Sequence, residues 1–333
     1  MLPLQTGEHM SDKQALNATF FAFRKREKAV LLPTSIAFAV IGIGLVALFA
    51  VLNWQAFVDY MNWAASMGAS NAAATANGVP PSMDAMMPPQ SVMSLMPAYF
   101  LFLLGYYVLL AAYEAACLRW MIHGETGGVF GLSFGADTWR VYFTYWLWFL
   151  LLIVFYIVCA IVAGGAMASI FMGMQGGTEP SPAVVVVPLV IGLVVLLALI
   201  YFCVRLAPAA ATSIARRKFA FFDAWKVSKG RFWGLFGAFV LLFLMFFVFI
   251  IAVEIAFIAM VGVTALSATG GAEPQSAEEA FRAFATPQYM AAVIGIILAM
   301  TVASFVFYVA LFGINARAAA LALEEGKITA GGA

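Results

Sequence analysis

Residues Gly234 to Leu266 read GLFGAFVLLFLMFFVFIIAVEIAFIAMVGVTAL, an apolar run with a single ionisable side chain, Glu254. A helix needs ~20 such residues to cross ~30 Å of hydrocarbon, so this run is long enough to span a bilayer. Five further runs reach a similar length. They cover residues 29–52, 96–118, 141–172, 183–206 and 290–314. The sequence therefore predicts an all-α membrane protein with six transmembrane helices.

The overall composition excludes a soluble globular protein. Of the 333 residues, 65% are hydrophobic and only 10% are charged, which is more apolar surface than a soluble domain of this size can bury. The segments outside the runs are too short or too biased in composition to form a core of their own. We expect one six-span membrane domain (residues 29–314), preceded by a cytoplasmic, basic and amphipathic segment (residues 1–28) and followed by a cytoplasmic tail (residues 315–333).

Basic residues are concentrated on one side of the six runs. Of the 17 Lys and Arg residues, fifteen precede the first run, follow an even-numbered run or lie in the tail, and Arg205 lies near the same end of the fourth run. Only Arg282 lies on the other side. Because loops rich in Lys and Arg are not translocated, both termini are predicted to be cytoplasmic. The first run has full span length and follows a basic cluster, so we expect it to be an uncleaved anchor.

Two segments predicted to be cytoplasmic share a pattern. Residues 130–148 read FGLSFGADTWRVYFTYWLW, and residues 219–236 read FAFFDAWKVSKGRFWGLF. In each, an aspartate (Asp137 or Asp223) is a good helix N-cap, and aromatic residues then lead into the lipid. A looser version, NATFFAFRKREK, occupies residues 17–28. We interpret these as cytoplasmic interfacial elbow helices preceding three tandem two-helix hairpins; the alternative is convergent interface chemistry without a repeat.

The elbows define a candidate lipid-binding surface. Trp suits the headgroup layer, and each basic residue near an anionic surface contributes ~1 kcal/mol of binding, so lipid is favoured over nucleic acid as the partner of this charge. We call the predicted surface the headgroup collar. It consists of Arg24, Lys25, Arg26, Trp139, Arg140, Trp225, Lys226, Lys229, Arg231 and Trp233.

Small residues end each even-numbered run. They are Ala111, Ala112, Ala115 and Ala116 in the second, Ala207 and Ala209 to Ala211 in the fourth, and Ala316 and Ala318 to Ala320 in the sixth. Small side chains let helix backbones approach closely. We therefore expect the even-numbered helices to pack centrally at their cytoplasmic ends.

A few polar residues lie within the runs, where they are costly and often functional. Glu114 and Arg205 occupy similar depths near the cytoplasmic ends of the second and fourth runs, and Asn315 ends the sixth. These three form a candidate polar cluster, either a binding site or a helix clamp, unless Arg205 instead extends to the interface. Glu254 is a candidate protonatable acid in the outer half of the fifth run; the alternative is an interfacial, hydrogen-bonded carboxyl.

Motifs for metal binding, cofactor binding or catalysis are missing from the sequence. Its two histidines and three cysteines lack the spacing of a metal or disulfide site, and phosphate loops and nucleophile elbows are not found. Methionines in the outer loop, residues 53–95, suit Cu(I) or, as we favour, an adaptable apolar cover. We expect no metal, no cofactor and no enzymatic activity.

Several motifs resemble a bacterial family. They are Arg119, His123-Gly124-Glu125, Leu206, Pro208 and residues 223–233, which read DAWKVSKGRFW. Together they resemble the membrane domain found beside some glycerophosphoryl diester phosphodiesterases and its stand-alone relatives. In fused members, catalysis belongs to a separate soluble barrel that this chain is expected to lack, so the resemblance does not imply phosphodiesterase activity. With the Phe- and Ala-rich composition, it implies a bacterial inner membrane protein.

Two functions are compatible with these features. The preferred one is a non-catalytic, lipid-interacting module of the cell envelope, or a scaffold that binds a protein partner or a second copy of itself. The alternative is a small-molecule or lipid transporter that uses Glu114, Arg205 and Glu254. A continuous polar path between Glu254 and Glu114 would favour the transporter.

Overall fold

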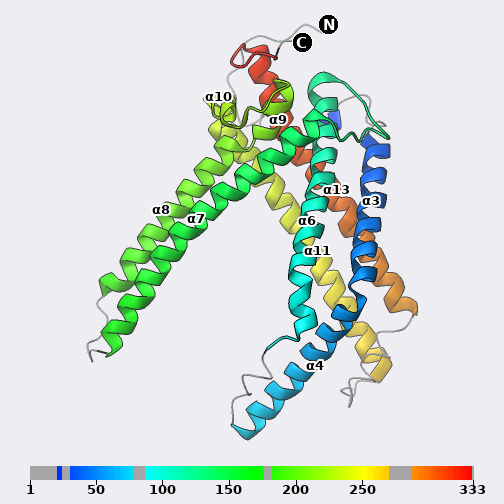
Figure 1. The fold of residues 1–333 in the computed structure, drawn as a ribbon, viewed down its shortest axis with the longest axis vertical. Coiled ribbons are helices and arrows are strands. Elements are labelled where there is room, and N and C mark those ends of the chain that lie inside the picture. The colour runs from blue at the N-terminus through cyan, green and yellow to red at the C-terminus, as the bar shows by residue number, and fades with distance from the viewer. Residues whose placement is uncertain (1–20, 25–30, 79–86, 176–181, 270–286, 332–333) are drawn as a thin grey trace. The chain divides into compact units, whose positions relative to one another are not determined.

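The computed structural model describes residues 21–24, 31–78, 87–175, 182–269 and 287–331, which are almost entirely helical (Figure 1). No strand forms in these ranges, where pairing is limited to one bridge between Val129 and Leu132. The long helices are α3 (Leu31–Leu52), α4 (Trp54–Asn77), α6 (Gln90–His123), α7 (Ala136–Gln175), α8 (Pro182–Leu206), α11 (Phe232–Thr269) and α13 (Pro287–Glu324). The short ones are α2 (Phe21–Arg24), α9 (Ala209–Ala215), the 3-10 turn η2 (Phe221–Asp223) and α10 (Ala224–Ser228).

Six of these helices, α3, α6, α7, α8, α11 and α13, are long and apolar enough to cross a membrane, as predicted. In α7, α8 and α13, no residue of the most apolar stretch of 18 residues is buried by the rest of the protein. Apolar surface on this scale needs lipid around it, because water would impose a large cost on it. The chain is therefore a multi-pass membrane protein. Several helices extend beyond the predicted runs, since hydropathy marks only their hydrocarbon-crossing part.

Contacts divide the chain into two compact units. The smaller unit contains Ala29–Ala116 and Thr126–Tyr142, and the larger contains Met1–Lys28, Cys117–Glu125 and Phe143–Ala333. Helices α6 and α7 each contribute to both units.

The first predicted hairpin, α3 with α6, forms the core of the smaller unit. The ring of Tyr113 stacks on Phe38 with centroids 4.7 Å apart, and its hydroxyl lies 2.8 Å from the Ser35 hydroxyl. Farther along the helices, the Phe49 and Phe102 rings lie 4.9 Å apart. Aromatic packing therefore holds the two helices together along most of the length of α3.

The outer segment, interpreted as a loop in the sequence, instead contains the helix α4. The break from α3 falls at Asn53, whose side-chain amide donates to the Phe49 carbonyl oxygen at 2.8 Å. Gly78 ends α4 in the left-handed conformation, with φ of 66°. The loop interpretation was wrong because it weighed hydropathy and overlooked the alanines of residues 54–77, which are strong helix formers.

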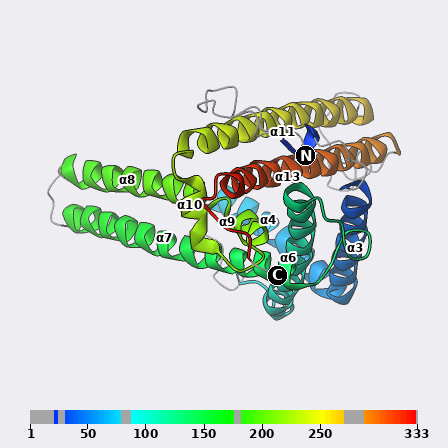
Figure 2. The ribbon, with the colours of Figure 1, turned by 90° about the horizontal axis from the view of Figure 1, so that it is seen from above.

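The larger unit contains the other two hairpins, α7 with α8 and α11 with α13, whose helices lie side by side in both views (Figures 1 and 2). Ring contacts join each pair. The centroids of Phe155 and Phe202 lie 5.9 Å apart, and those of Phe246 and Phe307 lie 4.5 Å apart. These helices expose apolar side chains along most of their length, as expected for lipid-facing hairpins.

Small residues allow close packing at one end of α13. Ala316 and Ala319 are fully buried, and a Cβ at Gly313 would lie only 3.1 Å from the Cβ of Ala22 in α2. The guanidinium of Arg317 also lies over the Phe21 ring, 5.5 Å from its centroid. Helix α2, which precedes the first span, therefore packs on the end of the sixth, consistent with an even number of membrane crossings.

The elbows differ from one another. Before α11, a distinct elbow forms from η2 and α10, and Asp223 occupies the N-cap position of α10, although without a side-chain capping bond. Before α7 there is no separate elbow, because α7 runs unbroken from Ala136 and Asp137 lies in its first turn rather than at the cap. In the first elbow, only Phe21–Arg24 is described, and it is helical.

Candidate functional site

The segment between α8 and α11, residues 207–231, carries six basic residues and one acid, and we call it the connector. Pro208 ends α8, since it lacks the N–H that a continuing helix needs. Its carbonyl oxygen then accepts from both the Thr212 amide (2.8 Å) and the Thr212 hydroxyl (2.7 Å), which starts α9. All seven residues of α9 are buried. The connector is therefore packed against the rest of the protein before it leads into α11.

One aromatic residue fixes the middle of the connector. The ring of Phe221 is fully buried in a cluster with Leu206, Ala209 and Ala224, and it meets the edge of Trp148 on α7 with centroids 6.1 Å apart. Each such buried side chain contributes about 2 kcal/mol relative to an exposed one. The connector is therefore anchored on the end of the α7–α8 hairpin.

Arg205 joins the end of α8 to the end of α10. Its Nη1 donates to the Ser228 carbonyl oxygen at 3.0 Å, and the Ser228 hydroxyl donates back to the Arg205 carbonyl oxygen at 2.9 Å. Its Nε donates to the Tyr201 hydroxyl at 3.3 Å. The ring centroids of Tyr201, Trp225 and Phe232 lie 5.3, 5.3 and 5.8 Å from its Cζ. Neutral groups and ring faces thus hold this guanidinium.

Asp223 organises the outer edge of the connector. Its carboxylate pairs with Arg216 at the end of α9, and the Lys226 ammonium lies 3.0 Å from its other oxygen. The buried Ser213 hydroxyl accepts from the Ala220 amide at 3.1 Å, which closes the loop between them. The sequence suggested Asp223 as a cap, but its carboxylate is used for these ion pairs.

The chain after α13 covers part of the connector. The Gly331 amide donates to the Arg216 carbonyl oxygen at 2.9 Å, and Ile328 is buried. Arg231 bonds the Glu325 carboxylate and also donates to the Val227 carbonyl oxygen at 3.3 Å. These contacts attach the C-terminal segment to the connector.

Two basic groups surround the carboxyl of Glu325. The Lys327 ammonium lies 2.9 Å from its second oxygen, opposite the bond from Arg231. Burial alone would raise the pKa of Glu325, but the hydrogen bond from Lys327 and the charge of Arg231 outweigh burial and hold the pKa below its ordinary value. This carboxylate is therefore ionised at neutral pH.

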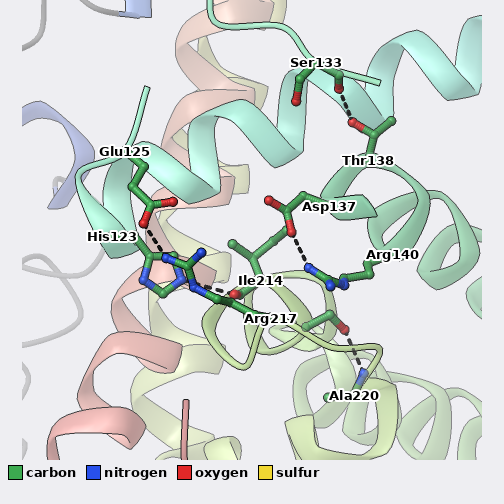
Figure 3. A network of polar contacts seen from close by, with 10 residues as sticks. His123, Glu125, Ser133, Asp137, Thr138, Arg140, Ile214, Arg217 and Ala220 are labelled. Carbon is green, nitrogen blue, oxygen red and sulfur yellow. Dashed lines mark hydrogen bonds and ion pairs between the residues drawn. The ribbon is translucent and has the colours of Figure 1, made fainter. Parts of the chain in front are cut away.

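The end of α6 also reaches the connector, as Figure 3 shows. His123 Nε2 lies 3.1 Å from the Ile214 carbonyl oxygen, and since a carbonyl can only accept, the contact needs the proton on Nε2. Glu125 pairs with Arg217, and both side chains are about half exposed. The His-Gly-Glu motif noted in the sequence thus has a structural role, in addition to forming the turn after α6.

The first turn of α7, in the smaller unit, has its own short-range polar contacts (Figure 3). Asp137 pairs with Arg140 one turn later, and the Thr138 hydroxyl donates to the Ser133 carbonyl oxygen. An acid in the first turn of a helix opposes the positive end of its dipole.

Most described members of the predicted collar are exposed, and one is not. Trp139, Trp225, Lys226, Lys229 and Trp233 are exposed, while Arg140 is partly buried beside Asp137. Arg231 departs from the prediction, because its side chain is only 6% exposed and turned toward Glu325 and α13. The Arg24 side chain, Lys25 and Arg26 lie outside the described residues.

Arg205 donates hydrogen bonds to Tyr201 and Ser228, and these bonds do not join it to the other members of the predicted polar cluster. Glu114 is buried, at 6% exposed, within the smaller unit, whereas Arg205 and Asn315 belong to the larger. Asn315 is 7% exposed, and its Oδ1 has no hydrogen-bond partner among the described residues. The pairing of Glu114 with Arg205 stays a prediction.

Three other expectations concern single residues and metals. Glu254 is exposed on the surface of α11. Within the described ranges, no three of His, Cys, Asp and Glu gather as a metal site would require. Of the outer-segment methionines, Met61 and Met67 lie on α4, and Met83 and Met86 lie outside the described residues.

Sequence reasoning missed two partners in this site, Ser228 and Glu325. Neither has a sequence signal of its own, since serine is common and Glu325 lies 94 residues from Arg231.

Comparisons with known proteins add no relative: no protein-family model matches the chain, and no significant match was found among curated proteins or solved structures.

Proposed function

We propose that this protein is a non-catalytic integral protein of the bacterial inner membrane, and that its connector binds anionic lipid headgroups on the cytoplasmic side. The observation that carries the proposal is the exposed face of the connector and the start of α11. Phe222 is 72% exposed and Trp233 is 77% exposed, beside the exposed ammonium groups of Lys226 and Lys229. Aromatic rings and cations at the ends of spans are the composition that headgroup layers favour.

The way the connector folds supports this use. Its apolar anchor, Phe221, faces the protein, while Phe222 and Trp225 remain at the surface. The buried anchor fixes the outward side chains at the end of the α7–α8 hairpin. The basic excess favours the cytoplasmic leaflet, since basic loops are retained there and its lipids are anionic. The kinship with the phosphodiesterase-associated membrane domain remains part of this proposal.

No specific observation favours the transporter. That alternative requires a polar path between Glu254 and Glu114. Glu254 is exposed on α11 rather than enclosed among helices. An exposed carboxyl on a membrane helix suits an interfacial position better than a proton relay.

The double variant Lys226→Gln/Lys229→Gln should weaken binding of phosphatidylglycerol about tenfold at low salt, since each lost charge removes ~1 kcal/mol and Lys226 is already partly neutralised by Asp223. The measurement is native mass spectrometry of the protein in mild detergent, titrated with phosphatidylglycerol or phosphatidylcholine. The wild type should retain more of the anionic lipid.

The matched control is Lys226→Arg/Lys229→Arg, which keeps both charges and should bind like the wild type. Equal retention of the two lipids by the wild type would overturn the proposal. So would unchanged phosphatidylglycerol binding in the glutamine variant. A bound protein or a second copy of the chain, without retained lipid, would favour the scaffold function.

A further inference from the structure

We propose that the guanidinium of Arg205 is the phosphate-binding group of a discrete site at the junction of α8, α10 and α11. The ligand is a phosphate oxyanion, either the phosphodiester of a lipid headgroup or free phosphate. The inference rests on the proposed function and deepens it, because it names one site and the chemical group recognised there.

The charge of Arg205 sets it apart from its neighbours. Three other arginines of this region pair with a carboxylate: Arg216 with Asp223, Arg217 with Glu125, and Arg231 with Glu325. Arg205 differs from them. Among the described residues, its contacts are with a hydroxyl, a carbonyl oxygen and three ring faces, none of which carries a negative charge. No carboxylate among the described residues therefore occupies the anion-binding positions of this guanidinium.

The guanidinium of Arg205 is also held in place before any ligand binds. The bonds from Nε to Tyr201 and from Nη1 to Ser228, with the surrounding rings, fix the plane of the guanidinium. Its Nη2 has no partner among the described residues. A free arginine side chain loses rotamer freedom when it binds a ligand, and here that ordering has already taken place. Nη2, with the second hydrogen of Nη1, presents donors suited to two phosphate oxygens.

The position of Arg205 also suits a phosphate. It lies in the last turn of α8, at the end of the apolar run, and a spanning helix enters the headgroup layer where its apolar run ends. Lys229, which is exposed, directly follows the serine that Arg205 holds. Helix α11 begins at Phe232, one of the three rings, so the positive end of its dipole is directed to the same place. Arg205 thus lies over the Trp225 ring, and Lys229 and the N-terminus of α11 follow within a few residues of its partner Ser228.

The test compares lipids that differ only in phosphate. In native mass spectrometry, wild-type protein should retain one molecule of phosphatidylglycerol or of phosphatidylcholine more tightly than diacylglycerol, which has the same chains and no phosphate. Arg205→Gln should weaken that tightest binding at least about tenfold, and Arg205→Lys should weaken it less, because lysine keeps the charge but not the bidentate donors. The control is Arg317→Gln, which removes an arginine outside the connector, over the Phe21 ring, and should bind like the wild type.

Inorganic phosphate separates the two sources. Competition between inorganic phosphate and the tightly held lipid would assign the site to free phosphate as well, and lack of competition would assign it to lipid alone. If Arg205→Gln does not fold, tryptophan fluorescence replaces it as the measurement. Short-chain phosphatidylglycerol should change the tryptophan fluorescence of the wild type, and diacylglycerol should not. The change should be lost in Trp225→Phe.

Failure of the Arg205 site and failure of the proposed function give different results in the Arg205 and Lys226/Lys229 variants. Loss of lipid in the Lys226/Lys229 glutamine variant, with unchanged binding in Arg205→Gln, would overturn this site and leave the general headgroup surface intact. Equal retention of diacylglycerol and phosphatidylglycerol by the wild type would also overturn it. Loss of a single tightly bound phospholipid only in the Arg205 variants supports it.

Discussion

Arg231→Met should lower the stability of the protein by about 2–3 kcal/mol, which corresponds to a fall of roughly 5 °C or more in melting temperature. The side chain is buried and its Nη1 donates to the carbonyl oxygens of Val227 (3.3 Å) and Ala318 (3.5 Å), while Nη2 bonds the Glu325 carboxylate. Methionine fills similar space but bonds none of these groups. The measurement is thermal unfolding in detergent, followed by the loss of monodisperse protein.

The matched control is Arg217→Met. Its ion pair with Glu125 is exposed, at 52% and 49% of the two side chains, so the variant should change stability by no more than about 1 kcal/mol. Equal effects of the two variants would mean that the Arg231 contacts do not attach the C-terminal segment to the connector.

The pH dependence of the Arg231 effect follows from Glu325. Because the pKa of this carboxyl is lowered in the folded protein, the ion pair contributes fully above the unfolded-state pKa. Its contribution is lost as the pH falls through the lower folded-state pKa. The difference in melting temperature between the wild type and Arg231→Met should therefore shrink in acid, below the ordinary range of carboxyl groups.

Gly128→Ala should destabilise the smaller unit by about 3 kcal/mol, since two costs add. The backbone at Gly128 has φ of +87°, which is unfavourable for alanine, and an added Cβ would lie 2.0 Å from the Leu132 carbonyl oxygen. Leu132 cannot yield easily, because its amide bonds the Val129 carbonyl oxygen at 3.0 Å and its side chain is buried. Thermal unfolding in detergent, or loss of expressed protein in the membrane, measures the effect.

The neighbouring glycine supplies the control. Gly127→Ala places its Cβ in open space at an ordinary backbone conformation and should be nearly neutral. Similar stability of the two variants would contradict the tight turn at residues 128–132. That turn matters because the Thr34 hydroxyl donates to the Phe130 carbonyl oxygen at 2.8 Å, which fixes the start of α3.

Hydropathy was enough to predict the six spans, because a membrane helix must satisfy its backbone internally and carry apolar side chains throughout. The alanines of residues 316–320 likewise predicted close packing, since small side chains act through backbone distance alone. Helix α4 was missed because it has no long apolar run. Its helix propensity, rather than its hydropathy, was the signal.

Side-chain partners in the connector were harder to predict. Arg231 and Lys229 look equivalent in sequence, yet one is buried and the other exposed. Arg231 pairs with Glu325, which lies 94 residues away in the sequence. The hydrogen bonds of Arg205 to Tyr201 and Ser228 likewise had no signal in the sequence. Contacts between residues distant in sequence follow from the fold, and local composition does not encode them.

The central claim is that the connector lies in the headgroup layer, and membrane depth tests it most directly. Nitroxide labels at Phe222→Cys and Trp233→Cys, in vesicles containing phosphatidylglycerol, report depth through their accessibility to oxygen and to a polar nickel complex. The background lacks the native cysteines, which are Cys117, Cys159 and Cys203. Both labels should report headgroup depth, between a lipid-facing label at Val248→Cys and an aqueous one at Lys327→Cys. Accessibility equal to that of the Lys327 label would contradict the claim.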